Sequence, residues 1–561
     1  MRWFGGCAPG KRPVAPVGAR LVWQDPPLWT VGDVVPGHLR TLEQSNAKLA
    51  VFGPCSATEQ DMKRALSSPM FASAAGAWAG SYTAVRGGPG GAVEVLADAT
   101  GASPVYTVAT PDGEVWGSSA FALGALAGGA VDTDWLGAYL RERNAPASGL
   151  SAWVGVRSVP PGHVLRWSSD GGAPSLAEWW SPSERSTDAA MAALRWALGE
   201  GVRVRVEGVT ATSDLAGMDS TTVTLLAARH GQVTGVTLHP VEITDGGDLE
   251  YAQSLCGEKV LCMRLPLTVG HLPFSESSVP LPVTDEPAPS TAVWAMFSEQ
   301  LRAVAAVRSG CHLTGDGGDN LFTVPPTHLV NLSRQGRLLR MVGDAMDWAR
   351  LRKQSPRLLI AAALRGDAGR IGRAERPRPA WLSANVPDPV GTGTTTDPNA
   401  LLVASIRGVA RSAKSELQLA DSLGVALHNP YFDGAVLDAV VSACAEVRFS
   451  ARRYKPLLAD AFAGVLPKAH RERASKGVFV GDFHQGLRIN LRRLLTLADG
   501  RLAARGLVSP GPLRAAMHAA ALGARTIWPP LLSAIAAESW LEAIDRSPRT
   551  EWCTLPWAGA Q

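Results

Sequence analysis

Residues 213–221 read Ser213-Asp214-Leu215-Ala216-Gly217-Met218-Asp219-Ser220-Thr221 and form a turn rich in small residues. A β-like run precedes this turn at 209–213, a helical run follows at 220–229, and a second β-like run occupies 235–239. The order strand, turn, helix, strand predicts a βαβ unit within a parallel sheet. In such sheets ligands bind at the carboxyl ends of the strands, which is where this turn lies.

The chemistry of this turn suits an anion. Backbone N–H groups converge where small residues lead into a helix, and the helix N-terminus adds partial positive charge. The hydroxyl of Ser220 can donate a further hydrogen bond. The turn therefore predicts a pyrophosphate-binding site, with an ordinary strand-to-helix turn and a serine cap as the alternative.

A second turn follows another predicted strand, Gly310–Leu313, and reads Leu313-Thr314-Gly315-Asp316-Gly317-Gly318-Asp319-Asn320. Carboxylates on a Gly-rich turn at the end of a strand are good Mg²⁺ ligands, especially if Asp219 converges on the same ion. The alternative is a solvated turn. Either turn alone is a weak signal, whereas the pair is far more specific.

The N-terminal part of the chain has a different pattern. Short β-like runs at 92–98, 105–108 and 114–118 alternate with Gly and Pro, which predicts an antiparallel sheet. Helical stretches at 59–66 and 135–143 make this half α+β. Beyond the second turn the chain is mostly helical, except for residues 369–399, which are rich in Pro, Gly, Thr and Arg. We expect this segment to be a mobile loop that acts as a lid.

Composition excludes several classes of protein. A chain of 561 residues with 54 Lys plus Arg against 50 Asp plus Glu is long enough for two or more domains, and its net charge is only +4. This excludes a small stapled module and a polyanion binder driven by bulk electrostatics, so nucleic acid is not expected as a partner. The seven Cys form no C-x-x-C pair, so we expect reduced cysteines without a disulfide framework. We find no signal peptide and no apolar run long enough to span a membrane, and we expect a cytoplasmic protein without a membrane anchor.

Taken together, the two turns resemble the synthetase domain of the asparagine synthetase family, with its S-G-G-x-D-S pyrophosphate loop and downstream G-x-G-x-D turn. Other segments occur in the family's order: Asp285-Glu286-Pro287, His428-Asn429-Pro430-Tyr431-Phe432-Asp433, Tyr454-Lys455-Pro456 and Ser475-Lys476-Gly477. Leu96-Ala97-Asp98 with Val105-Tyr106, and Pro160-Pro161-Gly162 with Trp179-Trp180, resemble the family's N-terminal domain and hinge.

The resemblance implies a mixed α+β and α/β chain of two domains. Residues 1–183 would form a glutaminase-like antiparallel domain of the Ntn type, and residues 184–561 a parallel-sheet synthetase domain of the PP-loop ATP pyrophosphatase type with a helical extension.

Two departures from the family pattern bear on function. A working glutaminase of this family uses a Cys directly after the initiator Met, whereas position 2 is Arg, and Cys7 would become N-terminal only if six residues were removed. We therefore predict a glutaminase domain without its nucleophile, so the acceptor amine must come from the substrate. In the pyrophosphate loop, Leu215 and Ala216 replace the family's first Ser and Gly, and Ser213 is the candidate replacement for the hydroxyl donor.

Family members that lack a working glutaminase and use an internal amine include β-lactam synthetase and the lasso-peptide macrolactam synthetases, or lasso cyclases. The Ala-Gly-Met-Asp-Ser-Thr loop, the length and the helical C-terminal extension resemble a lasso cyclase more closely. The implied reaction is ATP-dependent adenylation of an Asp or Glu side chain in a leader-free precursor peptide, followed by attack of its N-terminal amine. Alternatives are β-lactam or other small-molecule amide formation, asparagine-type transfer, and a non-catalytic peptide-binding pseudoenzyme.

The resemblance also assigns roles to residues. ATP and pyrophosphate would contact Ser213, Leu215, Ala216, Gly217, Met218, Asp219, Ser220, Leu238 and Gly315. Mg²⁺ would be held by Asp219 and Asp319. Asp316, with Glu286 as its partner, would accept the proton of the attacking amine, and Lys476 would neutralise charge on the phosphate and the oxyanion. Expected partners are the precursor peptide, a leader peptidase and a leader-binding recognition protein.

Overall fold

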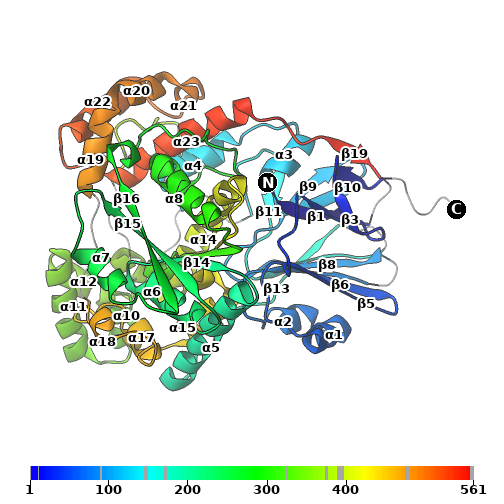
Figure 1. The fold of residues 1–561 in the computed structure, drawn as a ribbon, viewed down its shortest axis with the longest axis horizontal. Helices are drawn as coiled ribbons and strands as arrows, with labels where there is room; N and C mark the ends of the chain where they lie inside the picture. The colour runs from blue at the N-terminus through cyan, green and yellow to red at the C-terminus, as the bar shows by residue number, and fades with distance from the viewer. Residues whose placement is uncertain are drawn as a thin grey trace.

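The computed structural model describes residues 2–9, 12–88, 91–144, 149–169, 173–323, 326–372, 377–387, 397–473 and 480–555, without the side chains of residues 372 and 398. Antiparallel sheets occupy the N-terminal part of the chain and a parallel sheet lies in the C-terminal part (Figure 1). The last strand of the two six-stranded antiparallel sheets ends at Glu178, and the first helix of the following part begins at Thr187.

Two six-stranded antiparallel sheets pack face to face in the N-terminal half. Apolar side chains from both sheets, including Phe52, Trp116 and Trp167, fill the space between them. In order, the first sheet contains β11 (Val156–Ser158), β9 (Tyr106–Thr110), β10 (Gly113–Gly117), β1 (Trp3–Cys7), β4 (Leu28–Val31) and β3 (Arg20–Trp23). The second contains β13 (Ser175–Glu178), β12 (His163–Trp167), β8 (Val93–Leu96), β7 (Thr83–Gly87), β6 (Ala47–Phe52) and β5 (Leu39–Gln44).

Helices cover the outer face of each antiparallel sheet. The second sheet is covered by α1 (Glu59–Ser67) and α2 (Phe71–Ala75), and the first by α3 (Ala120–Leu126) and α4 (Thr133–Arg141). Thr58 begins α1 with a capping box, in which its hydroxyl accepts from the Asp61 N–H and the Asp61 carboxylate accepts from the Thr58 N–H. Such reciprocal bonds satisfy N–H groups that a helix N-terminus otherwise leaves without partners. The predicted strands and helices of this half are confirmed, and strands β1–β5, before residue 47, add to them.

The C-terminal half is built on a five-stranded parallel sheet. In order, its strands are β16 (Val260–Leu267), β15 (Val233–Pro240), β14 (Ala211–Asp214), β17 (Cys311–Leu313) and β18 (Leu427–His428). The predicted βαβ unit is confirmed, with α6 (Met218–Ala227) between β14 and β15. The run 202–206, which alternates Val and Arg, is the end of a 20-residue helix, α5 (Thr187–Val206). Its arginines are accommodated because Arg205 has a buried carboxylate partner.

Helices cover both faces of the parallel sheet, as its apolar strands require. Side chains of α5 and α6 pack on one face, and those of α8 (Trp294–Ala306) and α14 (Pro398–Ser422) on the other. Further helices around the sheet are α7 (Gly247–Gln253), η2 (Val269–His271), η3 (Pro289–Val293), α9 (Gly318–Phe322), α10 (His328–Arg334), α11 (Leu338–Arg352), α12 (Pro356–Leu364), α13 (Ala368–Gly372), η4 (Pro430–Phe432), α15 (Gly434–Ser442), α16 (Ala445–Arg448), α17 (Pro456–Ala461) and α18 (Lys468–Arg471).

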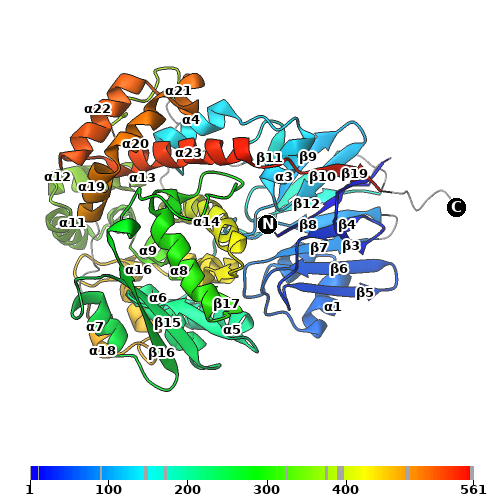
Figure 2. The same cartoon turned by 45° about the horizontal axis from the view of Figure 1, so that its top comes forward.

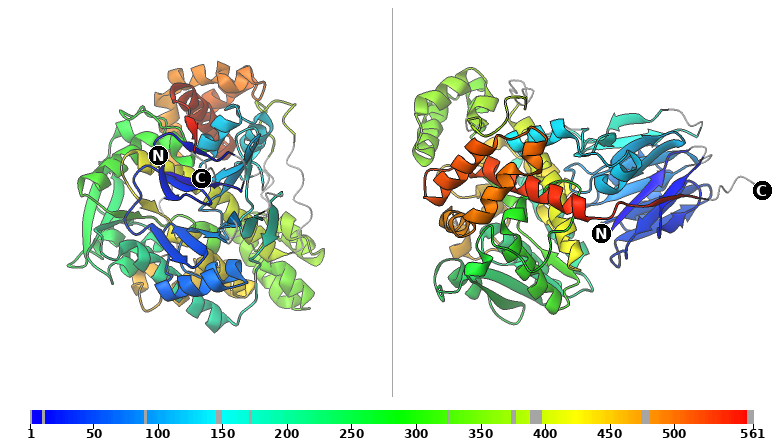
Figure 3. Two further views of the ribbon diagram at one scale, coloured as in Figure 1. Left: turned by 90° about the vertical axis from the view of Figure 1, so that its right-hand side faces the viewer. Right: turned by 90° about the horizontal axis from the view of Figure 1, so that it is seen from above.

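The C-terminal helices form a separate layer above the sheet (Figure 2). This layer comprises α19 (Val480–Ile489), α20 (Leu491–Thr496), η5 (Leu497–Asp499), α21 (Arg501–Ala504), α22 (Pro510–Ala521) and α23 (Trp528–Arg546). Its apolar side chains share one core with α3 and α4 of the N-terminal half. After α23 the chain runs back to the antiparallel sheets, where β19 (Trp552–Thr554) pairs with β2 (Val14–Pro16) (Figure 3). Among the described residues, no helix is long and apolar enough to cross a membrane.

Buried polar contacts join the two halves. Arg205 on α5 pairs with Asp433, with Nη1–Oδ2 at 2.8 Å and Nη2–Oδ1 at 2.5 Å, and Ser81 of the N-terminal half donates to Asp433 Oδ1 at 2.6 Å. The hydroxyl of Ser119 and the N–H of Phe121 both donate to Asp285 at 2.8 Å. Breaking such a buried network would leave a charge with fewer partners, which is costly in free energy. These contacts therefore stabilise the association of the two halves.

The segment 369–399 differs in part from a mobile lid. Trp381, Leu382 and Val386 are buried in the core shared with α4 and α22, and Leu382 forms a β-bridge with Val508. Residues 377–387 are therefore packed against the body of the protein, because their apolar side chains find a core that the composition of the segment did not reveal. Residues 373–376 and 388–396 lie outside the described residues.

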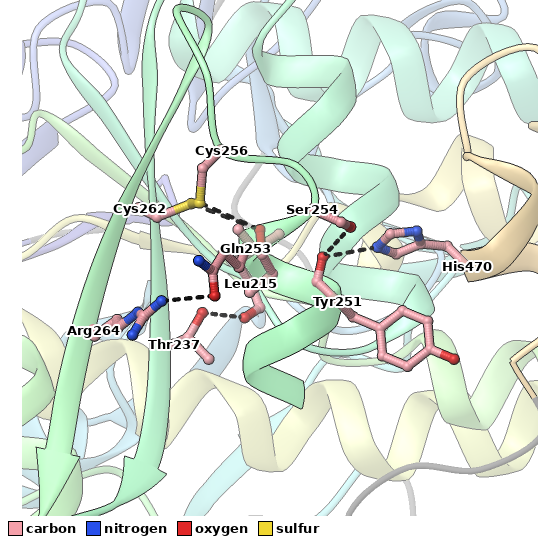
Figure 4. Close-up of a disulfide and its surroundings, with 10 residues drawn as sticks. Leu215, Thr237, Tyr251, Gln253, Ser254, Cys256, Cys262, Arg264 and His470 are labelled. Atoms are coloured by element: carbon pink, nitrogen blue, oxygen red, sulfur yellow. Dashed lines mark hydrogen bonds between the residues drawn. A yellow bond between two sulfur atoms is a disulfide. The ribbon is translucent and has the colours of Figure 1, made fainter. Parts of the chain in front are cut away.

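The prediction that all cysteines are reduced is wrong for one pair. Cys256, just after α7, and Cys262 on β16 form a disulfide, with Cα atoms 5.7 Å apart (Figure 4). The turn from α7 into β16 brings them together, although a separation of six residues matches no familiar motif. Cys7, Cys55 and Cys311 are buried free thiols, while Cys444 and Cys553 are exposed.

Reduction of this disulfide should loosen α7 and the start of β16. A closed loop of this length restricts the unfolded chain by about 2 kcal/mol, so the opening free energy of these elements, measured by hydrogen exchange, should fall by that amount with a phosphine reductant. A Cys256→Ala/Cys262→Ala variant should show the lower value with or without reductant. Equal protection of the wild-type protein in both conditions would show that the disulfide does not form in solution.

Candidate active site

A cavity of about 450 Å³ lies at the carboxyl ends of β14, β15 and β17. Both turns singled out in the sequence line it, and η3, α8 and α14 form its other walls. The predicted residues that line it are Leu215, Ala216, Gly217, Asp219, Ser220, Leu238, Gly315, Asp316 and Asp319. Folding of the parallel sheet therefore brings most of the predicted site to one place.

The two turns approach each other so closely that only glycine fits between them. A Cβ atom on Gly315 would lie 2.7 Å from the Ser220 backbone nitrogen, and one on Gly318 would overlap the Asp219 carboxylate. Gly317 has a φ of 92°, in the left-handed region that glycine adopts without strain. These glycines place the second turn directly against the N-terminus of α6.

In the first turn, the side chain of Leu215 packs inward and leaves its backbone at the cavity. The Leu215 side chain is fully buried, its N–H donates to the Val236 carbonyl at 2.9 Å, and its carbonyl accepts from the Thr237 hydroxyl at 2.6 Å. The Ala216 N–H donates to the Ser220 hydroxyl oxygen at 3.2 Å. The following N–H groups belong to the first turn of α6, where they have no partner within the helix and carry its partial positive charge. This arrangement suits a pyrophosphate.

Two residues predicted to contact ATP or pyrophosphate are not in the cavity lining. Ser213 is buried beneath α6, where its hydroxyl accepts from Thr224 at 2.9 Å and donates to the Asp214 carbonyl at 3.2 Å. Met218 is buried in the core on the same side of the turn. Neither lines the cavity, because the alternation of β14 and the start of α6 turn both side chains inward.

Lys455 joins the carboxylates predicted to bind metal. Its Nζ contacts Asp219 Oδ2 and lies 2.6 Å from Asp319 Oδ1, and its side chain is only 1% exposed. Burial lowers the pKa of Lys455, but the combined effect of nearby negative charge, chiefly from Asp219 and Asp319, is larger and raises it. The net shift of the pKa is therefore upward. Its backbone has a φ of 45° just before Pro456, which is uncommon for lysine and costly outside a constrained site. In the sequence, Lys455 is noted only as part of the Tyr454-Lys455-Pro456 segment. Its role in balancing the charge of the two carboxylates is seen only in this contact.

A divalent cation fits the same position. Asp219 and Asp319 converge on one ammonium group, so their oxygens can also converge on a metal ion. Within the part of the chain that is described, no group of three or more His, Cys, Asp or Glu is arranged to hold a metal. Two carboxylates are enough for Mg²⁺, which completes its coordination with substrate phosphates and water.

Glu416 on α14 is a second residue that the sequence did not reveal. Its carboxyl group lines the cavity, and its Oε1 accepts from the Ser290 N–H at 2.7 Å. Its Oε2 is buried and has no hydrogen-bond partner among the described residues. Burial, with a smaller contribution from Asp316, raises the pKa of Glu416 to about 7, against the opposing effect of Ser290. A carboxyl group with this pKa is suited to accept a proton near neutral pH.

Of the other two predicted catalytic residues, only Glu286 belongs to the described part of the chain. Glu286 is buried outside the cavity lining, 3.3 Å from Arg411 Nη1, and burial raises its pKa. It is therefore not a partner of Asp316 at the cavity. Lys476 lies outside the described residues. Just before it, Arg473 donates to the Ala216 carbonyl at 2.9 Å and pairs with Asp248, so this part of the chain reaches the first turn.

The N-terminal half offers no reactive thiol at the expected position. The Arg2 backbone N–H donates to Asp421 on α14 at 2.8 Å, and its guanidinium pairs with the same carboxylate. Cys7 lies buried in β1, and burial raises the pKa of its thiol to about 12. A separate cavity of about 210 Å³ lies between the halves and shares Ala413, Leu427 and Phe432 with the first.

A cavity at the carboxyl ends of a parallel sheet that helices cover on both faces is typical of ligand-binding α/β proteins. A family model for asparagine synthase matches residues 193–542, and the chain belongs to this family. Members of this family form amides at the expense of ATP. Comparison with curated proteins gives no match.

Two solved structures show weak similarity. One is described as the allosteric regulatory enzyme of purine biosynthesis, with 11% identity, a TM-score of 0.21 and coverage of 49% of this chain and 76% of that chain. The other is glutamine phosphoribosylpyrophosphate amidotransferase from B. subtilis complexed with ADP and GMP, with 12% identity, a TM-score of 0.21 and coverage of 56% and 75%. Neither likeness carries an argument about this chain.

Replacing Lys455 with Met should lower the stability of the protein and increase the stabilising effect of Mg²⁺. The variant leaves two carboxylates without their cation, so stability should fall by about 3 kcal/mol, at the low end for a broken buried pair. Mg²⁺ should raise the thermal midpoint of the variant more than that of the wild-type protein. The control is Lys468→Met, because Lys468 is 78% exposed and its loss should change neither quantity. Equal Mg²⁺ shifts in the wild-type protein and in Lys455→Met would contradict this site.

Proposed function

We propose that this protein is an ATP-dependent lasso-peptide cyclase that joins an Asp or Glu side chain of a precursor peptide to that peptide's N-terminal amine. The observation that carries the proposal is the conjunction of an adenylation-type cavity with a half that has no glutaminase nucleophile at position 2. We further propose that the N-terminal half is a glutaminase-like, Ntn-type domain that no longer releases ammonia. An activated carboxylate must then meet an amine that the substrate itself brings.

The first step is activation, because a carboxylate is a poor electrophile. The substrate carboxylate attacks the α-phosphorus of ATP, which forms an acyl-adenylate and releases pyrophosphate. The N-terminus of α6 and the Ser220 hydroxyl would bind the departing pyrophosphate. Asp219 and Asp319 would hold Mg²⁺, which neutralises phosphate charge when bound. Lys455, which contacts both carboxylates, would add positive charge beside the phosphates.

The second step is attack by the amine on the adenylate. An α-amine has a pKa of about 8, so a nearby base only has to take up the proton released as the C–N bond forms. Glu416 and Asp316 line the same cavity, and Glu416 has the better-matched pKa. The amide forms and AMP leaves. We retain Lys476 as the residue proposed to neutralise the oxyanion.

In ring closure the attacking amine belongs to the same molecule as the adenylate, so it can react with the adenylate faster than water does. An intramolecular amine has an effective molarity far above that of a free one. The partners that we propose follow from this chemistry: a precursor peptide, a peptidase that frees its N-terminus, and a protein that recognises the leader.

The reaction can be tested with a panel of leader-free peptides, including one encoded beside this chain, together with ATP and Mg²⁺. The expected products are AMP and a peptide lighter by one water. Asp219→Ala and Asp319→Ala should each lower pyrophosphate release at least ~10²-fold, the scale for losing key transition-state electrostatics. AMP formed only with small β-amino acids would favour a β-lactam-type synthetase instead, and no AMP with any substrate would favour a non-catalytic binding protein.

The pH dependence should report Glu416. Because its pKa is raised to about 7, its carboxyl group is protonated below that pH and cannot accept the amine's proton. The rate of ring closure should therefore rise as pH passes through about 7. Glu416→Gln should slow ring closure ~10²-fold. The remaining pH dependence of closure should come from titration of the substrate amine alone. Adenylation, measured by pyrophosphate release, should stay near normal. A Glu416→Gln variant with an unchanged closure profile would exclude this role.

A further inference from the structure

An apolar groove with a volume of about 350 Å³ adjoins the candidate active site. It lies at the ends of β15 and β16, between η2 and the start of α8 on one side and α19 on the other. Leu267, Leu272, Met296 and Phe483 line it. Leu238 lines both this groove and the active-site cavity, so the two spaces are neighbours that share this residue as a wall.

The apolar surface extends out of the groove. Val269, which lines it, is 57% exposed, and Val241 and Ile243, on the loop after β15, are each 46% exposed. Exposed aliphatic side chains in a groove, and next in the chain to residues that line it, are consistent with a site where another molecule binds.

Charge in the groove has one sign. Glu242 and Asp482 line it, and neither carboxylate makes an ion pair with the described residues. The only other titratable side chain in the lining is His271, whose Nδ1 accepts from the Thr268 N–H at 3.1 Å. Burial raises the pKa of Asp482, which indicates a carboxyl group that lacks a compensating cation. The groove is therefore complementary to an apolar molecule that carries positive charge.

The size of the active-site cavity limits what it can hold. About 450 Å³ has to accommodate ATP and the reacting carboxyl and amino groups. A peptide substrate is larger than the remaining space, so most of it has to lie outside. The groove lies next to the cavity, with Leu238 in the lining of both, and can receive the part of the peptide that lies outside.

We propose that this groove binds an apolar segment of the peptide substrate that also carries a basic side chain or a free α-amine. The proposal rests on the proposed function, because it assigns the groove to the peptide that the active site would activate. Aliphatic residues of the peptide pack against Leu267, Leu272 and Met296, and its positive group lies near Glu242 and Asp482.

The test uses a displayed library of random ten-residue peptides with free N-termini, selected on the full-length protein with Mg²⁺ and a non-hydrolysable ATP analogue. Peptides selected by the wild-type protein should be enriched in aliphatic residues and in Lys or Arg at least ~10-fold over the input. Val269→Asp should abolish the aliphatic enrichment. Glu242→Gln/Asp482→Asn should abolish the basic enrichment and leave the aliphatic one.

The matched control is Leu339→Asp on α11, because Leu339 is 93% exposed and does not line the groove. It should select the same peptides as the wild-type protein. If Val269→Asp also selects the same peptides, or the wild-type protein selects none with this character, the proposal is overturned. The proposed function is judged separately by AMP formation, so a protein that selects such peptides but forms no AMP retains the groove and loses the cyclase.

Discussion

Contact between the two turns at the carboxyl ends of β14 and β17 is the constraint on which the site depends. Gly315 and Gly318 allow the second turn to lie against α6, and this places Asp319 opposite Asp219. Two carboxylates close enough to contact one ammonium group repel each other unless a cation lies between them. Lys455 supplies that cation here, and a metal ion can replace it, so the same contact that demands charge balance also prepares a metal site.

The N-terminal half has Arg at position 2 and is joined to the C-terminal half by polar contacts. Arg2 is tied to α14 through Asp421, and α14 also carries Glu416 into the active-site cavity. Ser119 and Phe121 hold Asp285, close in sequence to Ser290, whose N–H bonds to Glu416. Loss of the N-terminal half would therefore remove hydrogen-bond and ion-pair partners of Asp421 and Asp285, which gives a physical reason to retain it.

The pyrophosphate turn shows why the chain tolerates a change of sequence there. The family's first Ser and Gly are Leu215 and Ala216 in this chain, yet the Leu215 side chain turns into the core against Gly235. What faces the cavity is the backbone, and backbone N–H groups do not depend on side-chain identity. Arg473, bonded to the Ala216 carbonyl, adds positive charge beside the same turn.

The sequence by itself determined the parallel βαβ unit, the antiparallel N-terminal strands and the two turns, because these follow from local periodicity and from small residues at strand ends. Only the tertiary structure decided that Lys455 joins Asp219 to Asp319, that Glu416 faces the cavity while Glu286 does not, and that Ser213 points away. It also decided the Cys256–Cys262 disulfide and the packing of Trp381. These contacts join residues that are distant in the chain or depend on how a turn orients a side chain, and no local pattern carries that information.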